Sequence, residues 1–167
     1  MTRQELTAYM EAIPPADREA MDAARQRQAE LAKPPGSLGK LEDISIRLAG
    51  ITGRVKNTVE HTRILVLAAD NGVIAEGVSC SPESVTLAQC INMTRHKTGM
   101  SALARYFGCD IVVTDVGIHA PGPFPGVRNE KIRQSTGNLR VEPAMTRQQV
   151  LDAIDVGIRL AREAKAQ

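Results

Sequence analysis

The first third of the chain repeats apolar residues every three or four positions, the spacing of helices that bury one side. Three helices are predicted there, near residues 2–13, 16–32 and 37–53. Thr2 and Glu5 form a capping box at the start of the first helix. Ser37 is placed to cap the third helix, and Gly53 to end it. Residues 1–60 are therefore predicted to form an N-terminal helical part.

Beyond residue 60, apolar runs alternate with helical segments. The runs Ile64–Ala68 and Ile111–Val116 have the length and composition of buried strands. Two helices are predicted between them, near residues 82–95 and 99–107. A strand, a crossover through helices and a second strand make up a βαβ unit, so a parallel sheet with flanking helices is expected.

The rest of the chain contributes one weaker strand candidate, near residues 127–133, and a last helix. Thr146 and Gln149 form a second capping box, and this helix is predicted to run to about Lys165. Two firm strands and one weak one are fewer than the roughly five or six of an average sheet. Residues 61–167 are therefore predicted to form an α/β domain whose sheet is incomplete in this chain.

A candidate binding site follows the first predicted strand, which opens into a polar turn at Asp70. Ligands of open α/β sheets bind at the carboxyl ends of the strands. After this turn, Ser81 is placed as the N-cap of the next helix and Pro82 as its first residue. Four residues then share one face of that helix: Val85, Thr86, Gln89 and Met93.

This face has two interpretations. The uncharged amide of Gln89, among apolar neighbours and behind a capping hydroxyl, suits a flat heteroaromatic ligand. The alternative is a capped core helix whose amide faces water. Asp70 and Asp115, each at the end of a predicted strand, are open to a similar pair of interpretations: contact with a ligand, or capping of the loop backbone. Spacing alone leaves these alternatives open.

The composition is that of a folded protein, with 43% hydrophobic and 24% charged residues. A formal net charge of +2 without a basic run, and only two Tyr and two Phe, argue against nucleic acid as a partner. No apolar run approaches the length needed to cross a bilayer, and residues 2–5 lack the apolar core of a signal peptide. A cytoplasmic protein without a membrane partner is therefore expected.

The cysteine and histidine residues show no metal-ligand spacing. Cys80, Cys90 and Cys109 are an odd number, widely separated, and are expected to be reduced and buried. His61, His96 and His119 are likewise isolated in the sequence. No metal site is predicted.

Five short motifs occur in order along the chain: Lys33–Glu42 (KPPGSLGKLE), Ala69–Val73 (ADNGV), Glu76–Ser79 (EGVS), Asp115–Ile118 (DVGI) and Pro143–Thr146 (PAMT). Together they resemble the nicotinate-nucleotide–dimethylbenzimidazole phosphoribosyltransferase family, over essentially the whole chain. The resemblance implies a Rossmann-like α/β domain with a smaller helical part, in a homodimer. It implies no metal or redox cofactor. The Lys33–Glu42 motif identifies the family, although a helix-turn-helix junction needs a similar sequence for structural reasons alone.

The resemblance also implies a reaction. Nicotinate mononucleotide donates its phosphoribosyl group to 5,6-dimethylbenzimidazole, giving α-ribazole 5'-phosphate and nicotinate, a step in cobamide (cobalamin) synthesis. Ser81 and Gln89 match residues of the family's azole slot, where Val85 and Met93 would provide apolar contacts. Asp70, at the turn after the first strand, is also expected to bind substrate.

The family's general-base glutamate matches no residue of this chain and would lie beyond Gln167, as would the glycine-rich segment that receives the nucleotide. No catalytic residue is therefore predicted here, and the chain corresponds to the N-terminal half of the family. Two positions depart from the family pattern. Asn71 stands where His is frequent, and an amide cannot carry a proton. Ser135 stands where Gly is frequent, and a residue with a Cβ resists positive φ, so a differently shaped loop is expected.

Two functional hypotheses follow. The first is a phosphoribosyltransferase that becomes active when the C-terminal half is supplied in trans or in the same polypeptide. The second is a non-catalytic benzimidazole-binding or assembly module. Glu76 is the carboxylate nearest the slot in the sequence and could replace the missing base, but a solvated loop glutamate is the alternative that the sequence favours.

Overall fold

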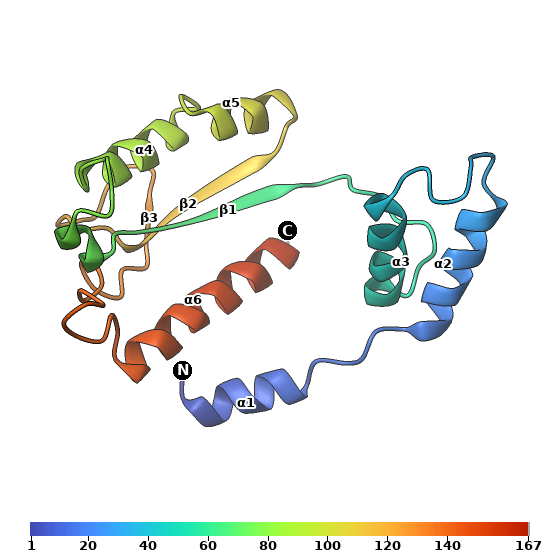
Figure 1. Ribbon diagram of the computed structural model, residues 1–167, viewed down its shortest axis with the longest axis horizontal. Coiled ribbons are helices and arrows are strands. Elements are labelled where there is room, and N and C mark those ends of the chain that lie inside the picture. The colour runs from blue at the N-terminus through green and yellow to red at the C-terminus, as the bar shows by residue number, and fades with distance from the viewer. Residues whose placement is uncertain (167) are drawn as a thin grey trace. The chain divides into compact units, whose positions relative to one another are not determined.

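The computed structural model of the protein describes residues 1–166 and divides into two compact units (Figure 1). One unit comprises residues 8–60. The other comprises residues 1–7 together with the chain from residue 61 onwards. The first helix, α1 (Arg3–Glu11), runs across the boundary between them. Its predicted capping box is confirmed: the Thr2 amide donates to the Glu5 carboxylate, and the Glu5 amide donates to Thr2 Oγ1.

The smaller unit is a pair of helices, α2 (Arg18–Glu30) and α3 (Lys40–Thr52). Small buried residues allow the two helices to approach closely: Ala20, Ala24 and Ala49. A Cβ on Gly50 would lie only 2.7 Å from the Met21 side chain, so this position has no room for a larger residue. The structure confirms that Gly53 ends α3, in the left-handed conformation that glycine adopts readily.

The prediction that Ser37 caps α3 is wrong. A run of turns separates Ser37 from the helix, and Gly39 is the N-cap residue. No side chain caps the helix; instead the carboxylate of Glu42, in its first turn, holds the preceding segment by accepting the Leu38 amide at 3.1 Å and pairing with Lys33 at 2.6 Å. The bond from Lys33 is the main cause of the lowered pKa of Glu42. The Lys33–Glu42 motif thus has a structural function within this unit.

The larger unit confirms the predicted α/β class. Its parallel strands are β1 (Arg63–Ala69), β2 (Asp110–Gly117) and β3 (Arg128–Asn129), in the spatial order β1-β2-β3. The third strand is shorter than predicted. Beyond Asn129 the chain leaves regular pairing, although the amides of Glu130 and Ile132 still donate to carbonyls of β2. The described part of the chain thus forms a three-stranded sheet that is not closed.

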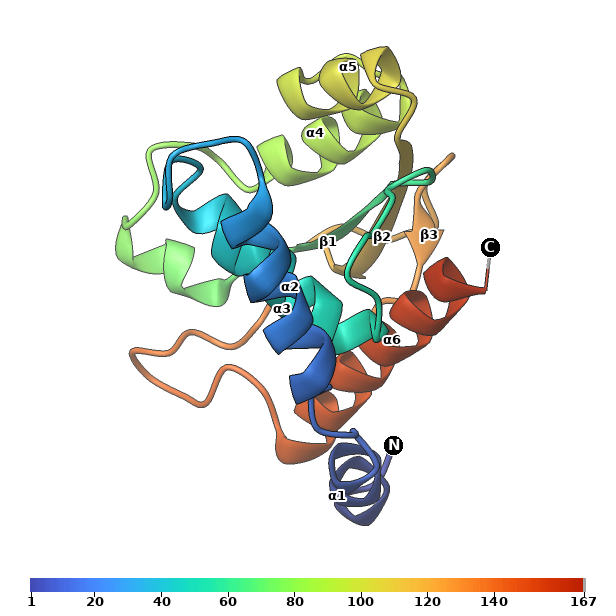
Figure 2. The same cartoon turned by 90° about the vertical axis from the view of Figure 1, so that its right-hand side faces the viewer.

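Helices cover both faces of this sheet. The crossover from β1 to β2 consists of α4 (Ser84–Thr94) and α5 (Gly99–Tyr106), and α6 (Arg147–Lys165) lies on the opposite face (Figures 1 and 2). Thr146 and Gln149 form the predicted capping box of α6. Apolar residues from the sheet, α4 and the following loops form the core: Ala68, Cys90, Val113, Ile118 and Val127. No helix among residues 1–166 is both long and apolar enough to cross a bilayer.

Candidate functional site

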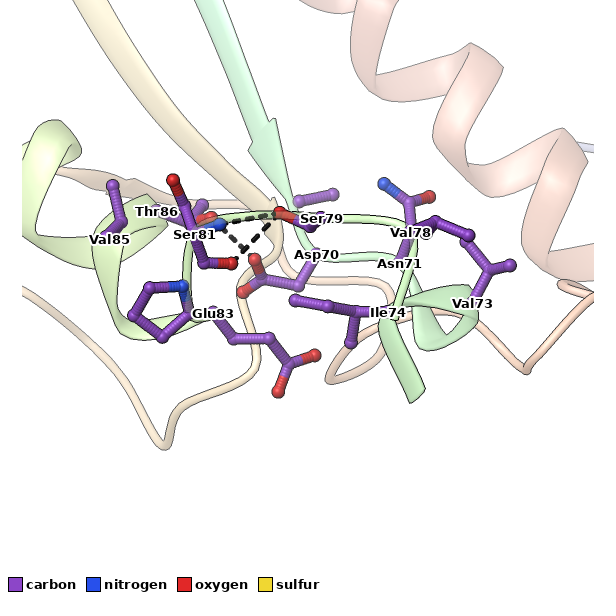
Figure 3. Close-up of a pocket in the computed structure, with 12 residues that line it drawn as sticks. Asp70, Asn71, Val73, Ile74, Val78, Ser79, Ser81, Glu83, Val85 and Thr86 are labelled. Atoms are coloured by element: carbon purple, nitrogen blue, oxygen red, sulfur yellow. Dashed lines mark hydrogen bonds between the residues drawn. The ribbon is translucent and has the colours of Figure 1, made fainter. Parts of the chain in front are cut away.

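A cleft of about 310 Å³ lies where β1 ends and α4 begins (Figure 3). Its floor is the turn after β1, and one wall is the short 3-10 helix η1 (Gly72–Glu76) with the chain that follows it. The first turn of α4 forms the other wall. Its lining is a mixture of polar and apolar side chains: Ala69, Asp70, Asn71, Val73, Ile74, Val78, Ser79, Ser81, Pro82, Glu83, Val85 and Thr86. Such a mixture is typical of small-molecule sites.

Three of the five residues expected in the azole slot line this cleft: Asp70, Ser81 and Val85. Gln89 does not line it, and its side chain is exposed. Met93 packs against the core of the larger unit. Residues four apart on a helix share a face but are displaced by a full turn, about 5.4 Å, along the axis. The cleft therefore reaches the first turn of α4, and Gln89 and Met93 follow one and two turns beyond it.

The predicted N-cap function of Ser81 is wrong. The helix begins at Ser84, with Glu83 as its N-cap residue and without a side-chain cap. Ser81 instead belongs to a local turn in which its amide donates to Ser79 Oγ at 3.1 Å, and the Ser79 hydroxyl donates to the Ser81 carbonyl at 2.9 Å. Because Ser81 Oγ is not used as a cap, this hydroxyl remains at the cleft surface. Ser79 was missed by the sequence analysis, although two serines separated by one residue are a signal for such a turn.

Asp70 is buried beneath the cleft, with 6% of its surface exposed. Its Oδ1 accepts a hydrogen bond from Thr86 Oγ1 at 2.6 Å, and its Oδ2 accepts the His119 amide at 2.7 Å. The carboxylate therefore joins the end of β1 to α4 and to the loop after β2. These bonds show the second interpretation of Asp70, in which its carboxylate caps the backbone of a loop. Asp70 also lines the cleft.

Asp115 is even more deeply buried, and its contacts are also internal. Its Oδ1 accepts the amides of Gly117 and Ile118 at 3.0 and 2.8 Å. Lys131 forms an ion pair with Oδ2 at 3.0 Å and donates its own hydrogen bonds to the carbonyls of Ile118 and Ala120. Asp115 thus shapes the loop after β2 and does not line the cleft.

The loop that contains Ser135 presses against the turn after β1. The Gly72 amide donates to Thr136 Oγ1 at 3.1 Å, and a Cβ on Gly72 would lie 2.5 Å from the Thr136 carbonyl oxygen. Ser135 keeps a left-handed conformation, with φ of 59°, despite its Cβ. Ser135 thus adopts the positive φ that we expected its Cβ to resist.

Two acidic side chains near the cleft have partners that the sequence did not reveal. Glu76 is exposed, as the sequence favours, and its carboxylate accepts a hydrogen bond from the side-chain amide of Asn138 at 2.7 Å and pairs with Arg140 at 3.3 Å. Glu83, which lines the cleft, lies 2.8 Å from His119 Nδ1. Glu83 and His119 are 36 positions apart in the sequence, so spacing could not reveal their contact.

The expected environment of the cysteines is correct for only one of them. Cys90 is buried in the core, and burial raises the pKa of its thiol. Cys80 is exposed on the loop before α4, and Cys109 is intermediate. The three thiols are free. Among the described residues, no three His, Cys, Asp or Glu side chains gather closely enough to hold a metal ion.

Comparison with known proteins identifies the family. A family model described as "Phosphoribosyltransferase" matches residues 13–167. A nicotinate-nucleotide–dimethylbenzimidazole phosphoribosyltransferase of Clostridium perfringens is 41% identical over 96% of this chain. The chain belongs to this family. The protein of the same name from Ruminiclostridium cellulolyticum is 45% identical over 88% of the chain. The resemblance inferred from the five motifs is thereby confirmed.

A solved member of the phosphoribosyltransferase family, from Thermus thermophilus, has the same fold. It superposes with a TM-score of 0.81 at 40% identity over 90% of this chain. The match covers 46% of the Thermus thermophilus protein. The matches to the Clostridium perfringens and Ruminiclostridium cellulolyticum proteins cover 44% and 42% of their lengths. The chain thus spans somewhat less than half the length of the relatives that it matches.

Proposed function

We propose that this chain provides the azole-binding part of a site that makes α-ribazole 5'-phosphate. In the reaction, 5,6-dimethylbenzimidazole receives the phosphoribosyl group of nicotinate mononucleotide, and nicotinate leaves. The observation that carries the proposal is the cleft at the carboxyl end of β1, lined by Ser81 and Val85 above the buried Asp70. Family membership supports the choice of reaction, because the matched relatives are named for it.

The chemistry assigns different tasks to the two halves of the site. One azole nitrogen attacks the anomeric carbon, the bond to the nicotinate nitrogen breaks with its electron pair leaving on nicotinate, and the other azole nitrogen loses its proton. In our proposal the Ser81 hydroxyl orients a ring nitrogen, and Val85 contacts the ring face. Asp70 holds the walls of the slot in place through Thr86 and His119. Proton removal and nucleotide binding belong to the family's C-terminal half, and the assembled cytoplasmic enzyme would be a homodimer.

Calorimetric titration of the chain with 5,6-dimethylbenzimidazole tests the slot. We expect weak, saturable binding. Ser81→Ala should lower the affinity about 2- to 13-fold, which corresponds to the loss of about 0.5–1.5 kcal/mol for one neutral hydrogen bond. Val85→Glu should abolish binding, because it places a charge against an apolar ring. Ser84→Ala is the matched control, since Ser84 is an exposed serine outside the cleft.

Gln89→Ala reports how far the slot extends along α4. A loss of affinity similar to that of Ser81→Ala would support the assignment of Gln89 to the slot, although its side chain lies outside the cleft. Equal affinity of Ser81→Ala and Ser84→Ala, or no binding to the wild-type chain, would contradict the proposal. A non-catalytic benzimidazole-binding or assembly module is the alternative. It predicts binding without turnover even when the C-terminal half is present.

A further inference from the structure

Glu83 is the acidic side chain of the cleft lining that keeps one carboxylate oxygen free. The cleft is lined by two carboxylates, those of Asp70 and Glu83. Both oxygens of Asp70 are occupied, by the Thr86 hydroxyl and by the His119 amide. Glu83 Oε2 lies 2.8 Å from His119 Nδ1, whereas Glu83 Oε1 has no hydrogen-bond partner among residues 1–166. The lining therefore contains one carboxylate oxygen that is still available as an acceptor.

His119 holds the Glu83 carboxylate in place. A carboxylate accepts hydrogen bonds, so the hydrogen of this contact belongs to His119 Nδ1. The backbone of His119 is fixed in turn, because its amide donates to the buried Asp70. Glu83 has no local task that competes, since it occupies the N-cap position of α4 without forming a side-chain cap. An acceptor that is already positioned loses little side-chain entropy when a ligand binds to it.

The Glu83 carboxylate lies on a different side of the cleft from the residues proposed to hold the azole. Figure 3 shows the Glu83 side chain extending away from Val85 and towards Ile74 in the opposite wall. In the proposed function, the Ser81 hydroxyl orients a ring nitrogen and Val85 contacts the ring face. The ring edge remote from Ser81, which carries the two methyl groups of 5,6-dimethylbenzimidazole, then faces Glu83.

We infer that Glu83, held by His119, selects azoles by the groups on this remote edge. It favours a benzimidazole that carries a hydroxyl or amino group there over one that carries methyl groups. The hydroxyl or amino group donates its hydrogen to Glu83 Oε1, and a hydrogen bond to a charged acceptor is roughly twice as strong as one between neutral groups. A methyl group displaces water from the carboxylate and returns no hydrogen bond. The inference rests on the proposed function for the orientation of the ring, and adds the class of azole that the site prefers.

Asn71 is the competing recognition group. Its exposed side chain also lines the cleft and has no hydrogen-bond partner in the described part of the chain. A carboxamide both donates and accepts, so Asn71 would bind a hydroxyl and a methoxy oxygen alike. A carboxylate only accepts, so Glu83 binds the hydroxyl and not the methoxy group. The two candidates therefore predict different ligand preferences.

Two azoles that differ in one hydrogen-bond donor test the inference. The probe 5-hydroxybenzimidazole carries the donor, and 5-methoxybenzimidazole keeps the oxygen without its hydrogen. We expect calorimetric titration of the wild-type chain to show about tenfold tighter binding of the hydroxy compound. This is the lower end of what a hydrogen bond to a charged group contributes, because 29% of the Glu83 side chain is exposed.

Variants of the pair show which group is responsible. Glu83→Leu should abolish the preference by weakening the binding of the hydroxy compound alone. Glu83→Gln should abolish it too, because an amide donates to the methoxy oxygen as readily as it accepts from the hydroxyl. His119→Phe should lower the preference about threefold, since the freed carboxylate has to be ordered by the ligand. Asn71→Ala should leave the preference intact, and Ser84→Ala, outside the cleft, should change neither affinity.

Equal affinity of the wild-type chain for the two azoles would overturn the inference and leave the proposed function standing. A preference that survives both Glu83 variants, or that Asn71→Ala removes, would also overturn it, because another group would then be the acceptor. A hydroxyl preference in a chain whose azole affinity does not change with Ser81→Ala would contradict only the proposed function. Failure of both azoles to bind the wild-type chain would contradict both. Circular dichroism reports whether each variant folds.

Discussion

Asp70 and Thr86 are joined by a hydrogen bond of 2.6 Å between the Oδ1 atom of the buried carboxylate and the hydroxyl in the first turn of α4. The other carboxylate oxygen accepts the His119 amide. One side chain at the end of β1 thus positions both the helix that forms a wall of the cleft and the loop after β2.

Asp70→Ala should lower the free energy of unfolding by about 2–4 kcal/mol, because it leaves the part-buried Thr86 hydroxyl and His119 amide without their charged acceptor. Urea unfolding followed by circular dichroism measures this change. Asp110→Ala is the control: its carboxylate is 71% exposed and pairs with Arg63 at the surface, where an ion pair contributes about 0–1 kcal/mol. Equal losses for the two variants would contradict the structural function of Asp70.

Ser135→Gly should stabilise the protein by about 1 kcal/mol. Ser135 has φ of 59°, a conformation that costs a residue with a Cβ about 1–2 kcal/mol, and its buried hydroxyl has no hydrogen-bond partner among the described residues. The relief of this strain and the removal of the unpaired hydroxyl stabilise the folded state. Together they outweigh the destabilisation that comes from the greater entropy of glycine in the unfolded chain. Thermal unfolding measures the effect. Gln134→Gly, at the exposed neighbour without positive φ, should lower the melting temperature instead, and a lower melting temperature for Ser135→Gly would refute the account.

The ion pairs of Glu130 should make the stability of the protein depend on pH. Hydrogen bonds from Arg159 and then Arg128 lower the pKa of Glu130 to about 2, against 4.5 without them. Because the folded-state pKa is the lower one, the stabilisation is complete above about pH 5 and is lost as the pH falls towards 2. Allowing for solvent screening, we expect the ionised Glu130 to contribute about 1–2 kcal/mol to the free energy of unfolding.

Glu130→Gln should therefore be less stable than the wild-type chain at pH 7 by that amount, and the difference should shrink between pH 5 and pH 2. Urea midpoints at several pH values measure it. Glu60→Gln, at an exposed residue, provides the control. A constant difference between Glu130→Gln and the wild-type chain across this range would show that packing and not charge is responsible.

Local signals in the sequence predicted the elements well. The two capping boxes, at Thr2 and Thr146, are present with both of their hydrogen bonds, because the partners lie within one helical turn. The apolar runs became β1 and β2 in parallel register. Ser37 and Ser81 were wrongly assigned as caps because turns separate each of them from its helix, and periodicity does not distinguish a turn from the first turn of a helix.

The candidate site was only partly predictable, because its geometry depends on distant contacts. Helical spacing predicted Ser81, Val85 and Gln89 in order along one helix, but it could not show that Ser81 precedes α4 or that the cleft ends after the first turn of that helix. The bond of Asp70 to His119 and the pair of Glu83 with His119 join segments 49 and 36 residues apart. The positive φ of Ser135 is imposed by contacts of its loop with Gly117 and Asp70, which outweigh the local preference of serine.

Nicotinate release from nicotinate mononucleotide and 5,6-dimethylbenzimidazole tests the division of the site between two halves most directly. The chain alone should release none, because our proposal assigns both nucleotide positioning and proton removal to the C-terminal half. Proton removal by a general base commonly raises the rate about 10²- to 10⁴-fold. The chain co-purified with the C-terminal segment of a relative should release nicotinate, and Val85→Glu should abolish this release. Turnover by the 167-residue chain alone would contradict the account, as would an inactive assembled pair.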